Sequence, residues 1–353
     1  MRIAIVGAGI AGRMLAWRLK KLGFSITIFD KNDRTSQAAC SFAPAGILSP
    51  LAELEMAEHR IFELGSRSMQ LYPQWLTEFT TPVFFRQIGS LITAHKNDRV
   101  EVDHFYRMVK RKLGNFDQYV QPVSISEKEL ELADLGEGLF LPTEGQLDPI
   151  ALLNALDKEL CDVEWQENSL VDSIEQGKLV VDGKEYKFDW IFDCRGLGAI
   201  GDLPLRAVRG ELLWLEAPDV DIKHLVRLMH PRYRIYIVPR PNNIYLVGAT
   251  EIESEDYSPV SVRSSLELLS AAYSVHKGFG EARIIKSVVN CRPALPDNLP
   301  LVKVEKGLGK INGLYRHGIL MAPALVDEAI EQLLKQLDSQ VKDNIENHYA
   351  VNS

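Results

Sequence analysis

The N-terminal part of the chain combines two short apolar runs with a helical pattern between them. Residues 2–6 and 25–29 are rich in β-branched side chains, as is typical of buried strands. Residues 13–22 carry apolar positions at helical spacing, and a glycine-rich turn leads into them. The pattern predicts a strand, a turn, a helix and a second strand that ends at Asp30, which together make a βαβ unit.

Further helices and strands follow in the first half of the chain. Amphipathic periodicity over residues 53–72 predicts a helix that ends at Pro73. Asp148 before Pro149 is typical of a helix N-cap and first residue, and this helix is expected to run to about residue 160. The pattern also predicts a strand or hairpin over 83–94, a surface helix over 98–113, an antiparallel meander of 163–165, 170–174 and 178–181 around Asp182 and Gly183, and a buried strand over 190–194.

The pattern changes after a second glycine turn at residues 195–199. Hairpin-like connections link the strands predicted at 211–215, 235–238 and 244–248. A helix is predicted at 261–273 and a further strand at 282–290. An apolar helix is expected from residue 319 to about 337, followed by a polar tail. The predicted fold class is α/β, and α+β overall: a Rossmann-like nucleotide-binding domain with an inserted antiparallel-sheet domain.

Composition and charge exclude several classes of protein. The chain has 353 residues, of which 46% are hydrophobic and 25% charged, as in a soluble globular protein of two modest domains. The net charge of −8 argues against nucleic acid as the main partner. We expect neither a transmembrane segment nor a signal peptide. The spacing of cysteines and histidines gives no metal-ligand pattern, so we expect no metal. The four cysteines are far apart in the sequence, which fits a reducing, cytoplasmic location.

The glycine-rich turn has the spacing of a dinucleotide-binding motif. It consists of Gly7, Ala8, Gly9, Ile10, Ala11 and Gly12. In such a motif the first glycine allows the tight turn, the second lets the backbone approach a pyrophosphate, and the third lets the helix pack closely on the strand. The helix N-terminus offers N–H groups to the phosphate, and Asp30 can accept a hydrogen bond from a ribose hydroxyl. The motif itself does not choose between NAD and FAD.

Nine ordered motifs together resemble the FAD-dependent D-amino acid oxidase family, and most of all its glycine oxidase branch of the thiamine-biosynthesis type. They span nearly the whole chain: 7–12 with Asp30, 45–50, 145–149, 193–196, 208–211, 236–240, 247–251, 292–297 and 315–320. The resemblance implies an FAD-binding domain of residues 1–78, 140–206 and 291–345, a substrate-binding domain of residues 79–139 and 207–290, and a tail of residues 346–353.

The resemblance also implies which residues bind FAD. The ADP moiety would contact the glycine motif, Asp30 and Lys31, and the backbone of Val171 would contact adenine. Ser41 and residues 45–48 would border the phosphates and the isoalloxazine ring, and the backbone N–H groups of residues 318–320 would face the flavin N1–C2=O edge. The further residues expected to bind FAD are Ala45, Gly46, Ile47, Leu48, Cys194, Gly196, Arg316, His317, Gly318, Ile319 and Leu320. A helix N-terminus there would stabilise the negative charge of reduced flavin.

Three residues are candidates for the catalytic site. By resemblance, Arg292 pairs with the substrate carboxylate, for which a planar guanidinium can donate two parallel hydrogen bonds. Tyr236 would donate its hydroxyl to the same carboxylate or line the pocket, and Arg316 would be a second anion contact. The structural alternatives are a surface ion pair for Arg292, a core tyrosine for Tyr236 and a helix-end role for Arg316.

Cys291 corresponds to the position that carries covalent flavin in the related sarcosine oxidase branch. Here Arg292 and Pro293 follow it, as in the non-covalent members of the family, so non-covalent FAD is expected and a covalent link at Cys291 is the alternative.

The reaction implied by the resemblance is oxidation of the C–N bond of a small amino acid or secondary amine, of the glycine or D-amino acid type. A hydride would pass to flavin N5, and O2 would reoxidise the flavin. Three other functions stay open. They are an amine dehydrogenase with an acceptor other than O2, a flavoprotein that acts on an aminomethyl or glycyl group of a macromolecule, and a flavin-binding accessory protein without turnover.

Overall fold

The N-terminal part of the chain folds as a strand, a helix and a second strand, as predicted. β1 (Arg2–Val6) and β2 (Ser25–Phe29) are parallel neighbours, and α1 (Ile10–Lys21) connects them. The computed structural model describes residues 1–114, 118–231 and 234–351, with side chains described up to residue 338. In both strands the first residue is exposed and the other four are buried, because other elements cover both faces of their sheet.

Within the described ranges, β1 and β2 belong to a six-stranded sheet with the order β20-β21-β13-β1-β2-β9. It is parallel except for β20, which is antiparallel to β21. The other four strands are β9 (Glu164–Gln166), β13 (Trp190–Asp193), β20 (Leu301–Glu305) and β21 (Leu308–Asn312). One face of the sheet packs with α1, α3 (His59–Leu76), α5 (Pro149–Glu159) and α7 (Gly318–Val351) into one large apolar core. Asp148 caps α5 as predicted, because its carboxylate accepts hydrogen bonds from the N–H groups of Ile150 and Ala151.

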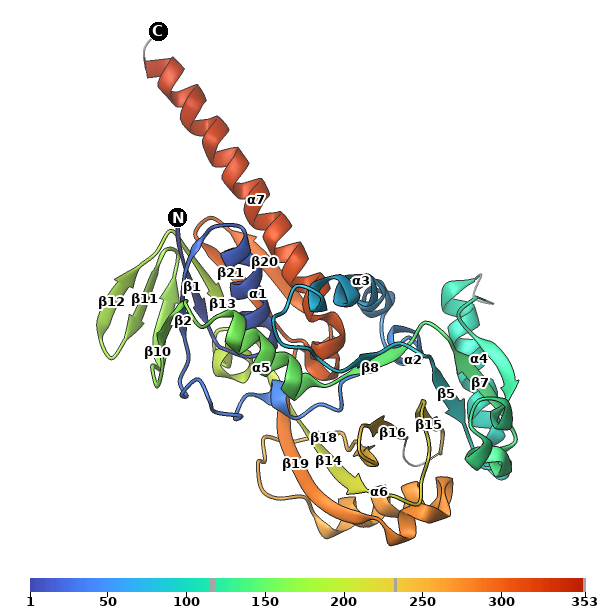
Figure 1. Cartoon of the computed structure of the whole chain (residues 1–353). Coiled ribbons are helices and arrows are strands. Elements are labelled where there is room, and N and C mark those ends of the chain that lie inside the picture. The colour runs from blue at the N-terminus through green and yellow to red at the C-terminus, as the bar shows by residue number, and fades with distance from the viewer. Residues whose placement is uncertain (115–117, 232–233, 352–353) are drawn as a thin grey trace.

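A small antiparallel sheet covers the opposite face of the six-stranded sheet (Figure 1). Its strands are β10 (Val171–Glu175), β11 (Lys178–Val181) and β12 (Lys184–Lys187). Asp182 and Gly183 form the turn between β11 and β12, both with positive φ, as a tight hairpin requires. The prediction that residues 163–165 belong to this meander is wrong. Glu164 and Trp165 instead lie in β9, which pairs in parallel with β2 and which Val163 precedes. A short apolar run does not reveal its partner strand.

A second large sheet, with nine strands in the described part of the chain, fills the other half of the molecule (Figure 1). It has the order β18-β14-β17-β16-β15-β5-β7-β6, and β19 pairs with β14. Its strands are β5 (Ser90–Thr93), β6 (Gln121–Ser124), β7 (Glu137–Leu141), β14 (Arg206–Glu216), β15 (Leu225–Leu228), β16 (Ile235–Arg240), β17 (Ile244–Gly248), β18 (Ile252–Glu253) and β19 (Arg283–Ala294). Its flanking helices are α4 (Arg99–Leu113) and α6 (Val262–Val275). β19 continues past residue 291, where a domain boundary is predicted, and the boundaries stay a prediction.

The prediction of one helix over residues 53–72 is wrong at both ends. The structure has a short helix α2 (Pro50–Glu53), a break, and then α3, which contains Pro73 in its interior. Pro73 is exposed, so α3 loses one backbone hydrogen bond on its solvent side while its buried side continues to Trp75. Trp75 packs edge-to-face on Trp17 of α1, with ring centroids 5.7 Å apart, and this contact favours the continued helix.

The hairpin predicted as one option over residues 83–94 is also wrong. β4 (Phe85–Arg86) and β5 belong to different sheets, because the chain passes from one to the other at Gly89. β4 pairs with β8 (Gly145–Leu147), which also pairs with β3 (Ile47–Leu48). Its side chains pack on both halves of the molecule: Leu48 and Leu147 belong to the large core of the six-stranded sheet, and Ile47 packs against a cluster of the nine-stranded sheet.

The last helix is longer than predicted. α7 continues to Val351 and extends away from the body of the molecule (Figure 1). After residue 337 the sequence contains neither glycine nor proline, so no residue there stops the helix. Most of the predicted polar tail is therefore helical, and residues 352–353 lie outside the described residues.

Candidate active site

The glycine motif forms a tight turn at the end of β1. Gly7 has φ +100°, and a Cβ there would lie 2.5 Å from the carbonyl oxygen of Cys194. A Cβ at Gly12 would lie 1.9 Å from the carbonyl oxygen of Gly7, so only glycine lets α1 pack this closely. The N–H of Ile10, in the first turn of α1, donates to the Ser41 hydroxyl at 3.0 Å. This arrangement brings the motif and Ser41 together, as the sequence predicts for a phosphate site.

Asp30 lies at the end of β2, beside the glycine turn. Its Oδ2 accepts a hydrogen bond from the N–H of Ala8 at 2.7 Å, and its Oδ1 accepts one from the N–H of Asn32 at 2.9 Å. The carboxylate thus supports the turn directly, and its role toward a ribose stays a prediction.

Sequence reasoning missed the structural role of Arg13. Its side chain is buried, with 3% exposed. Nε donates to the carbonyl of Ala8 at 2.8 Å, and Nη1 contacts Asp157 at 2.7 Å. Burial lowers the pKa of Arg13, although Asp157 opposes this shift. An arginine directly after the glycine motif, at a position where the helix faces the core, was the signal in the sequence.

The predicted segment 45–48 lies at the junction of the two large sheets. Gly46 has φ +69°, and a Cβ there would lie 1.9 Å from the carbonyl oxygen of Leu147. Arg240, at the end of β16, donates to the carbonyls of Ala45 and Leu147 and, at 2.5 Å, to Oε1 of Gln146. The Arg240 guanidinium therefore holds the second sheet against segment 45–48, which is expected to border the flavin.

A second group of predicted residues lies at the start of α7. Asn312 donates to the carbonyl of Gly196 at 3.1 Å, which fixes the glycine turn after β13 relative to β21. The Tyr72 hydroxyl donates to the carbonyl of Ile319, in the first turn of α7. The N-termini of α7 and α1 face the same cavity.

One cavity of about 1270 Å³ connects these parts. It extends from Asp30 and the glycine turn to Arg292 and Tyr236. The predicted FAD-binding residues that line it are Gly7, Ala8, Gly9, Ile10, Ala11, Asp30, Lys31, Ser41, Ala45, Gly46, Ile47, Val171, Cys194, Gly196, Arg316, His317, Gly318, Ile319 and Leu320. Gly12 and Leu48 lie behind its wall, where Gly12 packs on Gly7 and Leu48 is part of the large core. The size and the two helix N-termini suit a long dinucleotide.

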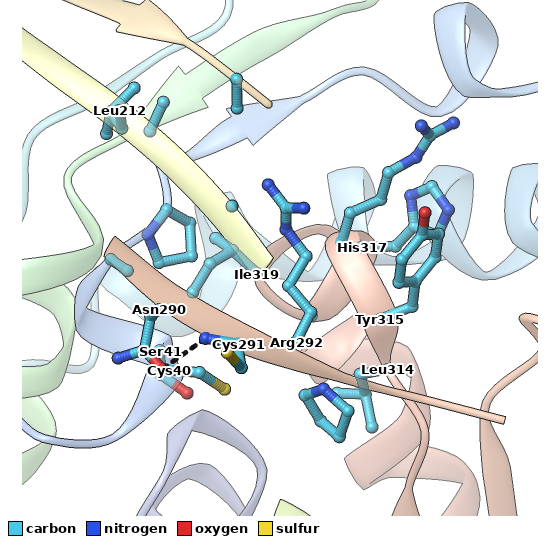
Figure 2. A pocket seen from close by; sticks show the side chains of 18 of the residues that line it. Cys40, Ser41, Leu212, Asn290, Cys291, Arg292, Leu314, Tyr315, His317 and Ile319 are labelled. Carbon is cyan, nitrogen blue, oxygen red and sulfur yellow. Dashed lines mark hydrogen bonds between the residues drawn. The ribbon is translucent and has the colours of Figure 1, made fainter. Parts of the chain in front are cut away.

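Arg292 extends from β19 into this cavity, between Leu212 and His317 (Figure 2). Its Nη1 and Nη2 each donate to the carbonyl of Thr250 at 3.2 Å. Among the described residues no carboxylate forms an ion pair with it. A half-buried guanidinium with spare donors is suited to bind an anionic ligand.

Tyr236 lies on β16 and also faces the cavity. A Cβ at Gly248 would lie 2.8 Å from its hydroxyl oxygen, so the absent side chain makes room for the ring. Burial raises the pKa of Tyr236, which keeps the hydroxyl protonated and able to donate. Within the described part of the chain this hydroxyl makes no hydrogen bond.

Arg316 differs from Arg292 because two carboxylates already neutralise it. Its Nη2 lies 3.0 Å from Oε2 of Glu53, and its Nη1 lies 2.8 Å from Oε2 of Glu251. Arg227 of β15 donates to the other oxygen of Glu53 at 2.9 Å. These contacts favour the structural alternative for Arg316, while its role as an anion contact stays a prediction.

Glu53, which sequence reasoning missed, is the centre of this charged cluster. Burial opposes its ionisation, but the guanidiniums of Arg316 and Arg227 outweigh burial and hold the pKa of Glu53 far below its usual range. His317 lies 3.5 Å from the same carboxylate, and burial lowers the pKa of His317 to about 4. The imidazole is thus neutral at pH 7. Glu53 follows Pro50 in a short helix that helical periodicity did not reveal.

Cys291 is buried beside Cys40, Ser41 and Asn290 (Figure 2). Its thiol points toward the carbonyls of Ser254 and Asp256, at 3.7 and 3.6 Å. Burial raises the pKa of this thiol. A protonated thiol that donates to backbone carbonyls is the state expected of a cysteine without a covalent flavin.

The described residues show neither a metal site nor a helix that could span a membrane. In the ranges that the structure covers, no three His, Cys, Asp or Glu side chains are grouped so as to hold a metal ion. None of the described helices is both long and apolar enough to cross a membrane.

Comparisons with known proteins agree with this geometry. The family described as FAD dependent oxidoreductase (DAO) matches residues 2–331. A relative from Rhizobium etli, named as thiamine biosynthesis oxidoreductase ThiO, is 40% identical over 338 residues, which are 95% of this chain and 97% of the relative. Glycine oxidase from Geobacillus kaustophilus is 26% identical over 94% of this chain and 93% of its own length. The crystal structure of that enzyme matches with a TM-score of 0.82 over 95% of both chains.

Proposed function

Because the chain belongs to the DAO family of FAD-dependent oxidoreductases, we propose that it oxidises the C–N bond of a small amino acid or secondary amine whose carboxylate binds to Arg292. The names of the relatives support a substrate of the glycine type.

The observation that carries this proposal is the difference between the arginines of the cavity. Arg316 and Arg227 both pair with Glu53, whereas Arg292 pairs only with backbone carbonyls among the described residues. An unneutralised guanidinium in a cavity strongly favours an anion, and its planar donors match a carboxylate. The substrate carboxylate is the anion that an amino acid supplies.

Tyr236 gives this carboxylate a second contact. Its hydroxyl is protonated and has no described acceptor, and its charged surroundings include Arg292, so both groups face one region of the cavity. Binding by Arg292 and Tyr236 would fix the position and rotation of the substrate, which is the main contribution that the chain makes to the rate.

The chain's own residues fit FAD. Glycines at positions 7, 9 and 46 line the cavity without side chains, and two helix N-termini face its interior. When bound, FAD supplies the hydride acceptor, and we propose O2 as the oxidant that regenerates it. The residues around Arg292 then orient the amine, and no side chain is required as a general base.

Anaerobic mixing tests the proposal. The purified yellow protein is mixed with glycine, sarcosine, D-alanine, D-proline and D-aspartate, and loss of the visible flavin band is followed. We expect at least one of them to bleach the flavin, and air to restore the colour with release of hydrogen peroxide. Bleaching by none would contradict the proposed substrate class. Rapid bleaching with slow recovery in air would contradict O2 and favour another electron acceptor.

A further inference from the structure

The guanidinium of Arg292 rests on two backbone carbonyls of the second sheet. Nη1 and Nη2 both donate to the carbonyl of Thr250 at 3.2 Å, and Nη1 also lies 3.5 Å from the carbonyl of Arg209. These contacts occupy the end of the guanidinium. They leave Nε and the outer hydrogen of Nη2, which together form one bidentate edge of an arginine.

Gly210 of β14 makes this position possible. A Cβ built on Gly210 would lie 2.1 Å from Nη2 and 2.4 Å from Cζ of Arg292. No side chain can occupy that space without moving the guanidinium. β14 and β19 are antiparallel neighbours with Val208 opposite Arg292, so the guanidinium extends along β14 by two residues.

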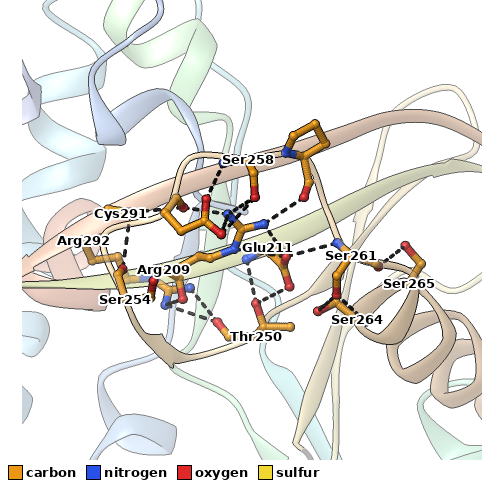
Figure 3. A network of polar contacts seen from close by, with 12 residues as sticks. Arg209, Glu211, Thr250, Ser254, Ser258, Ser261, Ser264, Ser265, Cys291 and Arg292 are labelled. Atoms are coloured by element: carbon orange, nitrogen blue, oxygen red, sulfur yellow. Dashed lines mark hydrogen bonds and ion pairs between the residues drawn. The ribbon is translucent and has the colours of Figure 1, made fainter.

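The Thr250 carbonyl is itself held by Glu211. The Thr250 hydroxyl donates to Oε2 of Glu211 at 3.0 Å and accepts from the N–H of Glu211 at 2.9 Å. The N–H of Thr250 donates to the carbonyl of Glu211 at 3.3 Å. Three contacts therefore join Thr250 to one residue of β14 (Figure 3).

Glu211 is fixed in turn by Arg209, and both side chains are buried (Figure 3). Nη2 and Nε of Arg209 contact Oε1 of Glu211 at 2.7 and 3.2 Å. Arg209 also donates to the carbonyls of Asp256 at 2.6 Å and Pro259 at 3.0 Å, in the loop that follows β18. A buried ion pair of this kind adds little net stability, whereas its fixed geometry can position its neighbours.

We propose that Gly210 and Thr250 form a cradle that positions the Arg292 guanidinium, with Glu211 and Arg209 holding the cradle, so that the substrate carboxylate binds side-on to Nε and Nη2. This inference rests on the proposed role of Arg292. It assigns positioning roles to two sequence motifs, residues 208–211 and 247–251, for which the resemblance alone implied no chemistry.

The first test removes the Thr250 hydroxyl and keeps its shape. Thr250→Val should raise the Kd for glycolate, an unreactive carboxylate, by about fivefold or more, with a smaller change in the rate of flavin reduction at saturating substrate. Glycolate binding is followed through the visible spectrum of the bound flavin. Thr250→Ser keeps the hydroxyl and should stay within about twofold of the native Kd.

Thr27→Val is the matched control. Thr27 is buried, whereas Thr250 is half-buried, and its hydroxyl likewise donates to a glutamate, Oε2 of Glu164, at 3.0 Å. It lies in β2 and does not line the cavity. It should lose stability in the same way as Thr250→Val without a change in the Kd for glycolate. Equal Kd values for glycolate in Thr250→Val and Thr27→Val would contradict the proposed cradle.

Gly210→Ala supplies a second variant in case Thr250→Val fails to fold. The added methyl group should displace the guanidinium and weaken glycolate binding by about tenfold or more. A crystal structure of the native holoenzyme with glycolate should show the carboxylate on Nε and Nη2. A carboxylate on the other edge of Arg292, or native affinity in Gly210→Ala, would contradict the inference. If Arg292→Met itself binds glycolate normally, the proposed function fails instead.

Discussion

The cavity contains several arginines, and their partners give them different roles. Arg292 is held only by backbone carbonyls among the described residues, while Arg316 bridges Glu53 and Glu251. The sequence, through the resemblance, assigned the carboxylate to Arg292 and only a second contact to Arg316. It could not show that Arg316 is neutralised, because the two carboxylates that pair with it come from distant segments. A sequence can thus indicate that a residue belongs to the site without showing which charged side chain pairs with it.

Arg316→Met should reduce stability more than substrate binding. The variant leaves Glu251 with the Tyr315 hydroxyl and removes one cation from Glu53, which should cost about 1–3 kcal/mol of unfolding free energy. The Kd for glycolate should change by less than about threefold. Urea unfolding and flavin-perturbation titration measure the two effects. A loss of glycolate affinity equal to that of Arg292→Met would show that Arg316 is a substrate contact.

His317 should make stability depend on pH. Its pKa is about 4 in the folded protein, below its ordinary value of 6.5, so between these values the unfolded chain binds more protons. Stability therefore falls as the pH is lowered from 7 to 5, and this histidine should account for about 2 kcal/mol of the loss.

His317→Gln removes that titration but keeps a side chain that can hydrogen-bond to Glu53. Denaturant unfolding at pH 7 and pH 5 should give the variant a shallower loss than the native protein. The neighbouring Glu53 remains charged over this range because its pKa is far lower. The same pH dependence in both proteins would mean that His317 does not titrate as described.

At the scale of elements, the glycine turn and α1 have the most demanding geometry. Gly12→Ala places a methyl group 1.9 Å from the Gly7 carbonyl oxygen, which should push α1 away from β1 and release FAD. Gly23→Ala is the control. Gly23 has φ +85° but nothing within 4 Å of the added carbon, so it should cost about 1 kcal/mol and keep FAD. Flavin content after gel filtration measures the difference, and full flavin retention in Gly12→Ala would contradict it.

The elements that sequence predicted well are those with strong local signals. The βαβ unit, the Asp148 cap of α5 and the Asp182–Gly183 turn depend on residues close together in the chain. The errors concern which strand pairs with which, and one helix that continues past a proline. Periodicity did not show that β9 pairs in parallel with β2, and Pro73 predicted an end that the packing of Trp75 overrides. Residues of α1, β16, β19 and α7 line the cavity, and the colours of Figure 1 show how far apart these elements are in the sequence.

At the scale of the whole molecule, Arg240 connects the nine-stranded sheet to the small sheet of β3, β8 and β4. It extends from β16 to the carbonyls of Ala45 and Leu147, and burial lowers its pKa to about 10, so it stays charged at pH 7. The cavity depends on this junction because one of its walls comes from each sheet. Inside the second sheet, Arg209 of the network in Figure 3 holds the loop after β18 through the carbonyls of Asp256 and Pro259.

Arg240→Met should weaken the junction. The variant keeps the apolar stem but leaves buried carbonyls without donors, which should cost about 2–4 kcal/mol of unfolding free energy and reduce FAD retention. Arg86→Met is the control. Arg86 of β4 is half-buried and the only hydrogen bond of its side chain among the described residues is to the carbonyl of Lys223 at 3.3 Å, so the variant should cost less than about 1 kcal/mol. Equal losses in the two variants would show that the junction does not depend on Arg240.

The central claim is that Arg292 binds the substrate carboxylate, and one measurement tests it most directly. Anaerobic flavin reduction is compared for a reactive amino acid and for its carboxamide, in the native protein and in Arg292→Met. The native protein should prefer the acid by at least about tenfold in reduction efficiency, roughly 1.4 kcal/mol, and the variant should lose most of that preference. An undiminished preference in Arg292→Met would contradict the account.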